Sequence, residues 1–387
     1  MNKIISNIKN EYLYRFFSSF DITSAIWVLY LGYKGMNLVQ IGLLEGIFHV
    51  TGLLSEIPTG ALADLFGRRR ILIIGRMMSL ISAIIMLFSN SFLGFAMGFI
   101  LSAWGYNLNS GSEEALIYDT LKELKKEDEY LKINGKINLI IEISQGLAVF
   151  IGGILSQIDF SISYITAIII GIISLTFSFN FKEVDIRDDF EERITIINHF
   201  KKSMKILKDN KKLLNIIMFF PIVYTFSAIV YFYGQQFLND LGYSRLNISI
   251  IFLLNGILSA IGAILSDKIY KKYNASGWLS ISMIISFLII LMGNISKELS
   301  VFTFLAIGFL TAILQPISSK LINSMVESKQ RATIISVESM FYSLMMIILF
   351  PVCGLIGDLL SLELSFKIIG IIGVVITTVE ILILKKK

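Results

Sequence analysis

Three titratable side chains, Asp21, Glu45 and His49, lie inside apolar segments near the N-terminus. An ionisable group in hydrocarbon is costly unless it faces a cavity or a partner, so each of the three is a functional candidate. Histidine titrates near neutral pH, and burial raises the pKa of a carboxyl group. We expect a proton relay in which Asp21 carries the proton with help from Glu45 and His49. The alternatives are an ion pair between Asp21 and Arg15 or a lysine, and a His49 that is packed against a neighbour.

The second apolar segment carries a stripe of polar and small residues. Glu45, His49, Gly52, Glu56 and Gly60 follow one another at spacings of 4, 3, 4 and 4 residues. In a helix these spacings place all of them on one face, which cannot face lipid. Glu56 is nearer the predicted cytoplasmic end, so we expect it to belong to a gate rather than to a substrate site.

The composition indicates a protein that crosses a membrane many times. Of its 387 residues 55% are hydrophobic and only 16% are charged, whereas soluble domains carry about 25% charged residues. A bilayer core requires about 20 apolar residues per helix, and its lack of water favours helices. The sequence predicts an all-α membrane protein with twelve spans, at 13–32, 38–62, 71–90, 92–116, 136–157, 161–181, 213–238, 246–267, 277–294, 299–322, 332–356 and 364–384.

The basic residues predict the orientation of these spans. With both termini in the cytoplasm, only Lys34, Arg245, Lys297 and Lys367 of the 34 lysines and arginines lie outside, as the positive-inside rule requires. The net charge of +5 therefore reflects topology and contact with the lipid bilayer, and not nucleic-acid binding. The single cysteine excludes an intramolecular disulfide, and we expect no metal site, because the two histidines lie far apart in the sequence.

The chain divides into two similar halves. The longest polar segment, residues 182–212, is predicted to be a cytoplasmic linker between a bundle at 1–181 and a bundle at 213–387. The segment after the second span, GALADLFGRR, matches AILSDKIYKK after the eighth, so that Asp64 corresponds to Asp267. Glu142 and Glu338 occupy equivalent places in spans five and eleven, which favours a shared gating role. Matched halves of this kind are typical of duplicated transporters, whose substrate site lies at the repeat interface.

The loop between spans two and three carries the most specific motif. It reads Gly-x-x-x-Asp-x-x-Gly-Arg-Arg, with Gly60, Asp64, Gly67, Arg68 and Arg69. With twelve spans and a central linker, the chain resembles the major facilitator superfamily over its whole length. That resemblance implies the family's fold, with two pseudo-symmetric six-helix bundles and alternating access.

Upstream of this motif, Glu56 and Pro58 form a Glu-x-Pro variant, which is also seen in the clostridial tetracycline efflux branch of the superfamily. In the family the loop latches the two halves together when the cavity faces outward, and Arg331 at the start of span eleven is the expected partner. We expect Gly67 to relieve a tight turn and Asp119 to pair with the basic loops. The predicted gating residues are Glu56, Gly60, Asp64, Gly67, Arg68, Arg69, Asp119, Glu142, Asp267, Arg331 and Glu338.

Neutral polar and aromatic residues supply candidates for a substrate cavity, which we predict to include Asp21, His49, Tyr231, Gln235, Gln315 and Tyr342. The resemblance implies a secondary transporter of the bacterial inner membrane, monomeric, powered by a proton gradient without a cofactor. We expect it to export amphipathic small molecules such as drugs. Uptake of a small nutrient is the alternative, and a non-transporting membrane sensor is a remote one; no motif indicates an enzyme.

Two departures from the efflux pattern weaken the expectation of antiport. The fifth span keeps only Gly152 and Gly153 of a glycine series that contains Gly-Pro in the family's antiporters. The fourth span lacks the arginine that many drug/proton antiporters carry.

Overall fold

A computed structural model describes residues 2–184, 210–273, 277–292, 296–326 and 331–385. Thirteen α-helices lie in these ranges, together with a 3-10 turn at Glu127–Glu129. Most of the linker predicted at 182–212 lies outside the described residues, because residues 185–209 are not among them. The helices are α1 Asn2–Ser18, α2 Trp27–Tyr33, α3 Leu38–Phe66, α4 Arg68–Phe88, α5 Phe92–Glu123, α6 Tyr130–Ile158, α7 Phe160–Asn180, α9 Lys211–Asp240, α10 Arg245–Tyr273, α11 Gly277–Met292, α12 Lys297–Ser324, α13 Arg331–Leu359 and α14 Leu362–Lys385.

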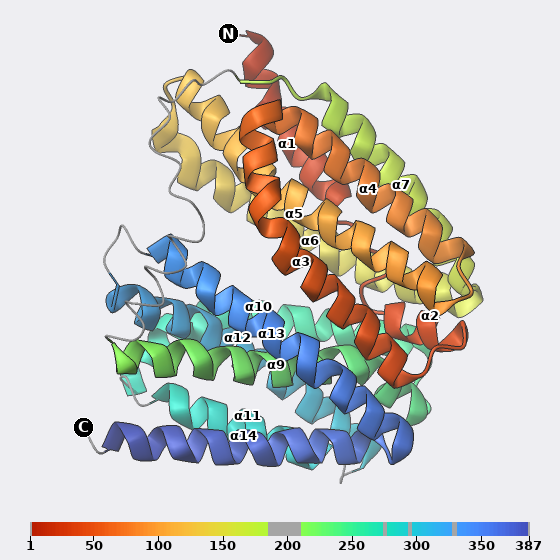
Figure 1. The fold of residues 1–387 in the computed structure, drawn as a ribbon, viewed down its shortest axis with the longest axis vertical. Helices are drawn as coiled ribbons and strands as arrows, with labels where there is room; N and C mark the ends of the chain where they lie inside the picture. The colour runs from red at the N-terminus through yellow and green to blue at the C-terminus, as the bar shows by residue number, and fades with distance from the viewer. Residues whose placement is uncertain (1, 185–209, 274–276, 293–295, 327–330, 386–387) are drawn as a thin grey trace. The chain divides into compact units, whose positions relative to one another are not determined.

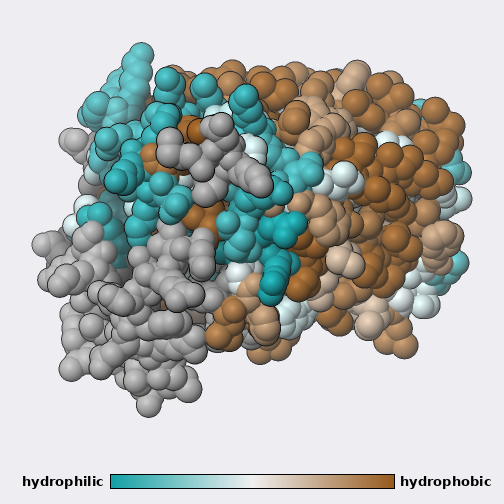
Figure 2. All heavy atoms as spheres, turned by 90° about the horizontal axis from the view of Figure 1, so that it is seen from above, coloured by the Kyte–Doolittle hydropathy of each residue, from teal (hydrophilic) through white to brown (hydrophobic). Residues whose placement is uncertain are grey.

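The helical class predicted from the sequence is confirmed. Within the described ranges, 9 helices are long and apolar enough to cross a membrane, and α11 is a shorter apolar helix. The count of twelve spans and the cytoplasmic placement of both termini stay predictions. Large hydrophobic side chains, among them Phe88, Leu93 and Ile264, are exposed along the helices. In Figure 2, hydrophilic side chains gather toward one side of the face shown and hydrophobic side chains predominate toward the other, as expected of a lipid-facing surface.

The first predicted span, 13–32, is not one continuous helix, so that prediction is wrong. α1 ends at Ser18 and α2 begins at Trp27, with turns between them. Asp21 Oδ1 accepts hydrogen bonds from the backbone N–H of Thr23 at 2.9 Å and from its hydroxyl at 2.7 Å. The hydroxyl of Ser24 donates to the carbonyl of Asp21 at 3.0 Å. Short polar side chains that bond to nearby backbone compete with the helix, which explains the break.

Contacts divide the chain into two compact units. Unit 1 comprises Met1–Tyr30 and Ile47–Arg193, and unit 2 comprises Leu31–Gly46 and Ile194–Lys387. The first part of α3 therefore belongs with the helices of unit 2, although the linker predicted between the two bundles lies at 182–212. The predicted bundle boundaries themselves stay a prediction.

Equivalent helices have equivalent neighbours within each unit. In unit 1, α4 packs against α5 and α7, and α1 packs against α6 and α7. In unit 2, α11 packs against α12 and α14, and α9 packs against α13 and α14. Figure 1 shows α4 beside α7 and α11 beside α14. These neighbours follow the order expected from the repeat that relates Asp64 to Asp267.

A glycine of α6 accommodates the broken segment between α1 and α2. A Cβ atom added to Gly152 would overlap the backbone carbonyl of Ile22, whose side chain is fully buried. About two turns earlier on the same helix, the hydroxyl of Ser144 donates to the carbonyl of Phe16. Small residues at a helix contact allow close backbone approach, which here lets non-helical backbone lie against α6.

We predict that Gly152→Ala destabilises the protein by about 1 to 3 kcal/mol, because the methyl group meets backbone that cannot rotate away. The measurement is the thermal unfolding midpoint of the purified full-length protein in detergent. Gly135→Ala on the same helix is the matched control, since nothing lies within 4 Å of a Cβ at that position. Equal midpoints for the two variants would show that α6 and the Ile22 segment are not in close contact.

Candidate functional site

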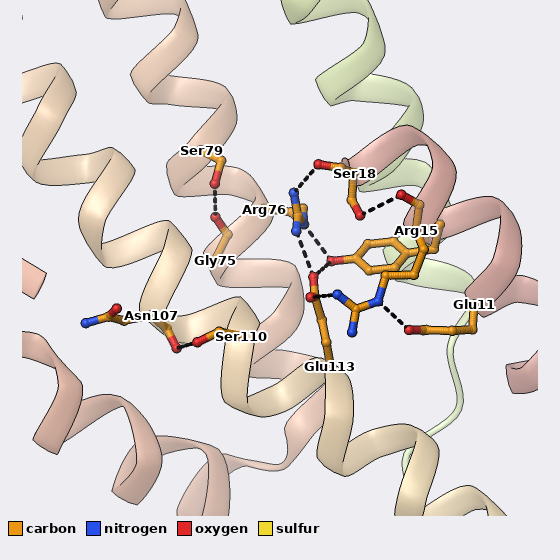
Figure 3. Close-up of polar contacts among 10 residues, drawn as sticks. Glu11, Arg15, Ser18, Gly75, Arg76, Ser79, Asn107, Ser110 and Glu113 are labelled. Carbon is orange, nitrogen blue, oxygen red and sulfur yellow. Dashed lines mark hydrogen bonds and ion pairs between the residues drawn. The ribbon is translucent and has the colours of Figure 1, made fainter. Parts of the chain in front are cut away.

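A cluster of buried charged side chains joins α1, α4 and α5. Glu113 Oε1 accepts hydrogen bonds from the phenol of Tyr14 at 2.6 Å and from Arg76 Nη2 at 2.7 Å. Glu113 Oε2 accepts from Arg15 Nη1, and Arg15 Nε donates to Glu11 Oε1 at 2.7 Å. Arg76 Nε donates to the phenol of Tyr14 at 2.6 Å. Figure 3 shows Glu113 reaching from α5 between Arg15 and Arg76. We call Glu11, Tyr14, Arg15, Arg76 and Glu113 the charge cluster.

Helical spacing and small residues position the charge cluster. Glu11, Tyr14 and Arg15 lie on successive turns of one face of α1. The ring of Tyr14 is fixed by a core that contains Leu72, Leu116 and Phe181. α4 and α5 approach closely, because Cβ atoms at Gly75 and Gly105 would meet groups of the facing helix within 3.0 Å.

The cluster balances two guanidinium groups against two carboxylates in a buried setting. The exposed fractions of the side chains are 1% for Glu11, 5% for Glu113, 14% for Arg15 and 16% for Arg76. Glu11 precedes the span predicted at 13–32. Burial raises the pKa of Glu11 to about 7, against the opposing effect of the Arg15 guanidinium, and the Glu113 carboxylate adds to the increase. The pKa of the Glu11 carboxyl group therefore lies close to neutral pH.

Asp21 lies apart from this cluster in the broken segment. Its side chain is exposed and holds the local turn through Thr23. Arg15 forms its ion pairs with Glu11 and Glu113. The alternative of a structural Asp21–Arg15 pair is therefore wrong, because Arg15 is already held by two carboxylates. The role of Asp21 in proton transfer stays a prediction.

The loop between α3 and α4 makes the tight turn that its sequence predicts. Gly67 has a φ of 89°, which an L side chain rarely adopts, and α4 begins at the next residue. A Cβ atom at Gly67 would lie 2.8 Å from Glu183 Oε2. The carboxylate of Glu183 accepts the backbone N–H of Arg69 at 3.1 Å, and Arg69 Nη2 donates to the carbonyl of Phe179 at 2.9 Å. Glu183 thus occupies the anion position at the start of α4.

The remaining gating candidates differ in their contacts and in their exposure. Arg68 Nε lies 2.5 Å from Asp119 Oδ2 of α5, so Asp119 pairs with a basic loop residue. Asp267 lies 2.5 Å from Lys271 Nζ on the surface of α10, and Arg331 is exposed at the start of α13. Gly60 and the side chain of Asp64 lie outside what the structure describes. The latch predicted from Asp64 and Arg331 stays a prediction.

The stripe along α3 is partly buried. Glu45 is buried, His49 is half-buried with its ring edge-on to Phe48, and Glu56 is exposed. The amide of Asn107 on α5 donates to the carbonyl of Gly52 at 2.7 Å and to the hydroxyl of Ser55 at 2.8 Å. Asn107, which the sequence did not single out, therefore holds the middle of the stripe.

The cavity candidates of unit 2 differ in accessibility. Tyr231 is half-buried, and its ring centroid lies 4.7 Å from that of Phe252. Gln235 is fully buried, Gln315 is exposed and Tyr342 is half-buried. Of the paired gating glutamates, Glu142 is exposed and Glu338 is half-buried.

The first turn of α3 is capped from two directions. Asn37 Oδ1 accepts the N–H of Gln40 at 2.9 Å and Gln40 Oε1 accepts the N–H of Asn37 at 3.1 Å, which forms a capping box. Asp358 of α13 accepts the N–H groups of Leu38 at 2.9 Å and Val39 at 2.8 Å. The phenol of Tyr233 donates to the carbonyl of Leu38 at 2.8 Å. All of these residues belong to unit 2.

The family assignment follows from comparison with known proteins. A family model described as Major Facilitator Superfamily matches residues 12–296. The chain belongs to the major facilitator superfamily. This superfamily is one of transporters rather than enzymes, so the chain is a multi-pass membrane protein of that type.

Relatives and solved structures agree with the superfamily assignment. YxaM, an uncharacterised MFS-type transporter of Bacillus subtilis (strain 168), is 23% identical over 357 residues, which is 90% of this chain and 88% of that protein. The crystal structure of the nucleoside transporter NupG matches with a TM-score of 0.83 and 14% identity, covering 100% of this chain and 100% of that chain. A D-xylose-proton symporter matches with a TM-score of 0.72 and 13% identity, covering 97% and 96%. At these identities the two structures show the fold alone.

Sequence reasoning also missed Arg76, Glu11 and Asp358 of this superfamily member. Arg76 stands within an otherwise apolar run of α4, and its charge was the signal that could have revealed the cluster. Glu11 gave no comparable signal, because it lies in a polar N-terminal segment. Asp358 could not be found either, because its partners at Leu38 and Val39 are backbone groups far away in the chain.

We predict that Arg76→Gln lowers the free energy of unfolding by about 3 to 5 kcal/mol, because it removes one partner of a buried ion pair. The measurement is thermal unfolding in detergent. Arg70→Gln is the control, since Arg70 is exposed on the same helix. If both variants unfold at the same temperature, the cluster does not hold α4 to α5.

We predict that Asp358→Ala weakens the start of α3 by about 1 kcal/mol, as loss of a capping carboxylate does, and that Asp358→Asn has a smaller effect because it keeps one acceptor. Hydrogen–deuterium exchange of peptides covering residues 34–44 should become faster. Asp159→Ala, which removes the cap that accepts from Ser161 on α7, is the control and should leave that exchange unchanged.

Proposed function

We propose that this chain is a proton-coupled secondary transporter that exports amphipathic small molecules across the inner membrane of a bacterium. The observation that carries the proposal is the break between α1 and α2, where Asp21 is exposed. Non-helical backbone at membrane depth is tolerated where it is buried in protein or lines a cavity, and broken helices form the ion and substrate sites of many transporters.

The break presents a carboxylate that can take up a proton. Asp21 Oδ1 accepts two hydrogen bonds from Thr23, and among the described residues Oδ2 accepts none. The hydrogen bonds to Oδ1 fix the position of the carboxylate. Oδ2, which accepts no hydrogen bond among the described residues, can then bind a proton or a cation. Glu45 and His49, one turn apart on α3, are the proposed relay partners, because a carboxylate and an imidazole can each accept and donate a proton.

Export and substrate class rest on sequence resemblance and on local aromatic surface. The Glu56-x-Pro58 loop resembles the efflux branch, and the half-buried Tyr231 beside Phe252 offers an aromatic wall for an amphipathic molecule. Two units of equivalent helix packing suit alternating access by a monomer with both termini in the cytoplasm. In this scheme Asp64, Arg68, Asp119 and Arg331 act at the cytoplasmic gate.

We predict that inverted membrane vesicles with an acidic interior accumulate ethidium, an amphipathic aromatic cation, and that a protonophore abolishes the accumulation. Asp21→Asn should remove most of the proton-driven part, because the amide cannot carry the proton. Asp128→Asn is the control, since Asp128 is exposed in the turn before α6.

The direction of transport is tested in the same vesicles. Labelled uridine and xylose serve as nutrient probes, because the solved structures of similar fold include a nucleoside transporter and a D-xylose-proton symporter. Proton-driven loss of a nutrient probe from the inverted vesicles, with no ethidium accumulation, would replace export by uptake. Ethidium accumulation that survives Asp21→Asn would remove Asp21 from the mechanism.

A further inference from the structure

We propose that Glu11 is a proton-binding site of the transport cycle, separate from Asp21, and that protonation of Glu11 releases Arg15 to Glu113 alone. The inference rests on the proposed proton coupling. It starts from the charge cluster, in which two acids on different helices share one guanidinium group.

The two carboxylates of the charge cluster accept different numbers of hydrogen bonds. Glu113 accepts hydrogen bonds from Tyr14, Arg15 and Arg76, so three donors favour its ionised form. Within the described residues, Glu11 accepts one side-chain hydrogen bond, from Arg15 Nε, although its side chain is only 1% exposed. A proton entering the cluster therefore binds to Glu11.

The surroundings of Glu11 leave few groups that could take the proton instead. Arg15 on its own helix, Glu113 on α5 and Arg76 on α4 are the charged groups that act on it. Tyr12 and Tyr14 on α1 are the phenols that interact electrostatically with Glu11, and a phenol stays protonated near neutral pH. The two guanidinium groups stay protonated, and the burial of Glu11 opposes its ionisation.

Protonation of Glu11 changes the net charge of the charge cluster and the ion pairs that Arg15 makes. With Glu11 ionised, two carboxylates balance Arg15 and Arg76. With Glu11 protonated, the cluster carries an excess positive charge, and the Arg15 Nε–Glu11 bond loses its charge assistance. Arg15 binds α1 to α5 through Glu113 in both states, and after protonation Glu113 is the one carboxylate still ionised beside Arg15 among the residues of the charge cluster. Because Glu11 precedes the first predicted span on its predicted cytoplasmic side, it is suited to exchange protons with the cytoplasm.

Thermal stability tests proton binding without a substrate. Burial raises the pKa of Glu11 from its ordinary value of 4.5 to about 7, so the folded protein binds more protons than the unfolded chain between these pH values. The stabilising contribution of protonated Glu11 is complete below pH 4.5 and is lost as the pH rises through 7. The unfolding midpoint of the wild type in detergent should therefore fall between pH 5 and pH 8 by more than that of Glu11→Gln. Glu11→Asp should keep part of the difference, and Glu127→Gln, on an exposed turn, should behave as the wild type.

Transport coupling is then measured in proteoliposomes with ethidium and an internal pH dye. Glu11→Gln is expected to lose the proton movement that ethidium drives, and Glu127→Gln to keep it. Unchanged proton movement in Glu11→Gln overturns the inference, whether or not its stability profile has changed. An unchanged stability profile also overturns it. If wild-type proteoliposomes show no proton movement while Glu11→Gln alters the stability profile, the proposed function fails and Glu11 is a titrating structural group.

Discussion

The carboxylate of Glu113 is the point to which three helices of unit 1 are attached. It receives hydrogen bonds from α1 through Tyr14 and Arg15 and from α4 through Arg76. A buried charge that lost these partners would be destabilising, so the three helices must keep their mutual register for as long as Glu113 is ionised. The close approach of α4 and α5 at Gly75 and Gly105 follows from the same constraint, because the guanidinium must reach the carboxylate.

Among the described residues, Glu183 and Asp358 are carboxylates that bind the start of a helix from a distant segment of the chain. Glu183 accepts the N–H of Arg69 at the start of α4, and Asp358 accepts those of Leu38 and Val39 at the start of α3. Both acids come from segments distant in sequence, so each helix start is fixed by tertiary structure. Hydrogen bonds to these otherwise unpaired amides place an acid where the helix dipole favours it.

Features that depend on local chemistry could be predicted from the sequence. The turn at Gly67 and the helical class followed from spacing and hydropathy, and the superfamily followed from a resemblance carried by the loop motif. Asp119 was expected to meet a basic loop residue. Features that depend on distant partners could not be predicted. In the sequence, Glu11 is an ordinary polar residue of the N-terminal segment, and its role depends on Glu113 of α5, which lies close to it only in the folded protein. No sequence pattern marks a side chain such as that of Asp358, whose partners are backbone N–H groups.

The interruption between Ser18 and Trp27 also alters how polar residues in the first span should be interpreted. Residues of a continuous helix advance by a constant rotation, so a helical wheel through 13–32 would assign every one of them to a single set of faces. Residues 19–26 are not helical, and the rotation accumulated through α1 is therefore not carried into α2. The face that α1 directs at Glu113 and the face of α2 are set independently. The segment predicted as the first span thus contains two separately oriented helix surfaces, with Asp21 on neither of them.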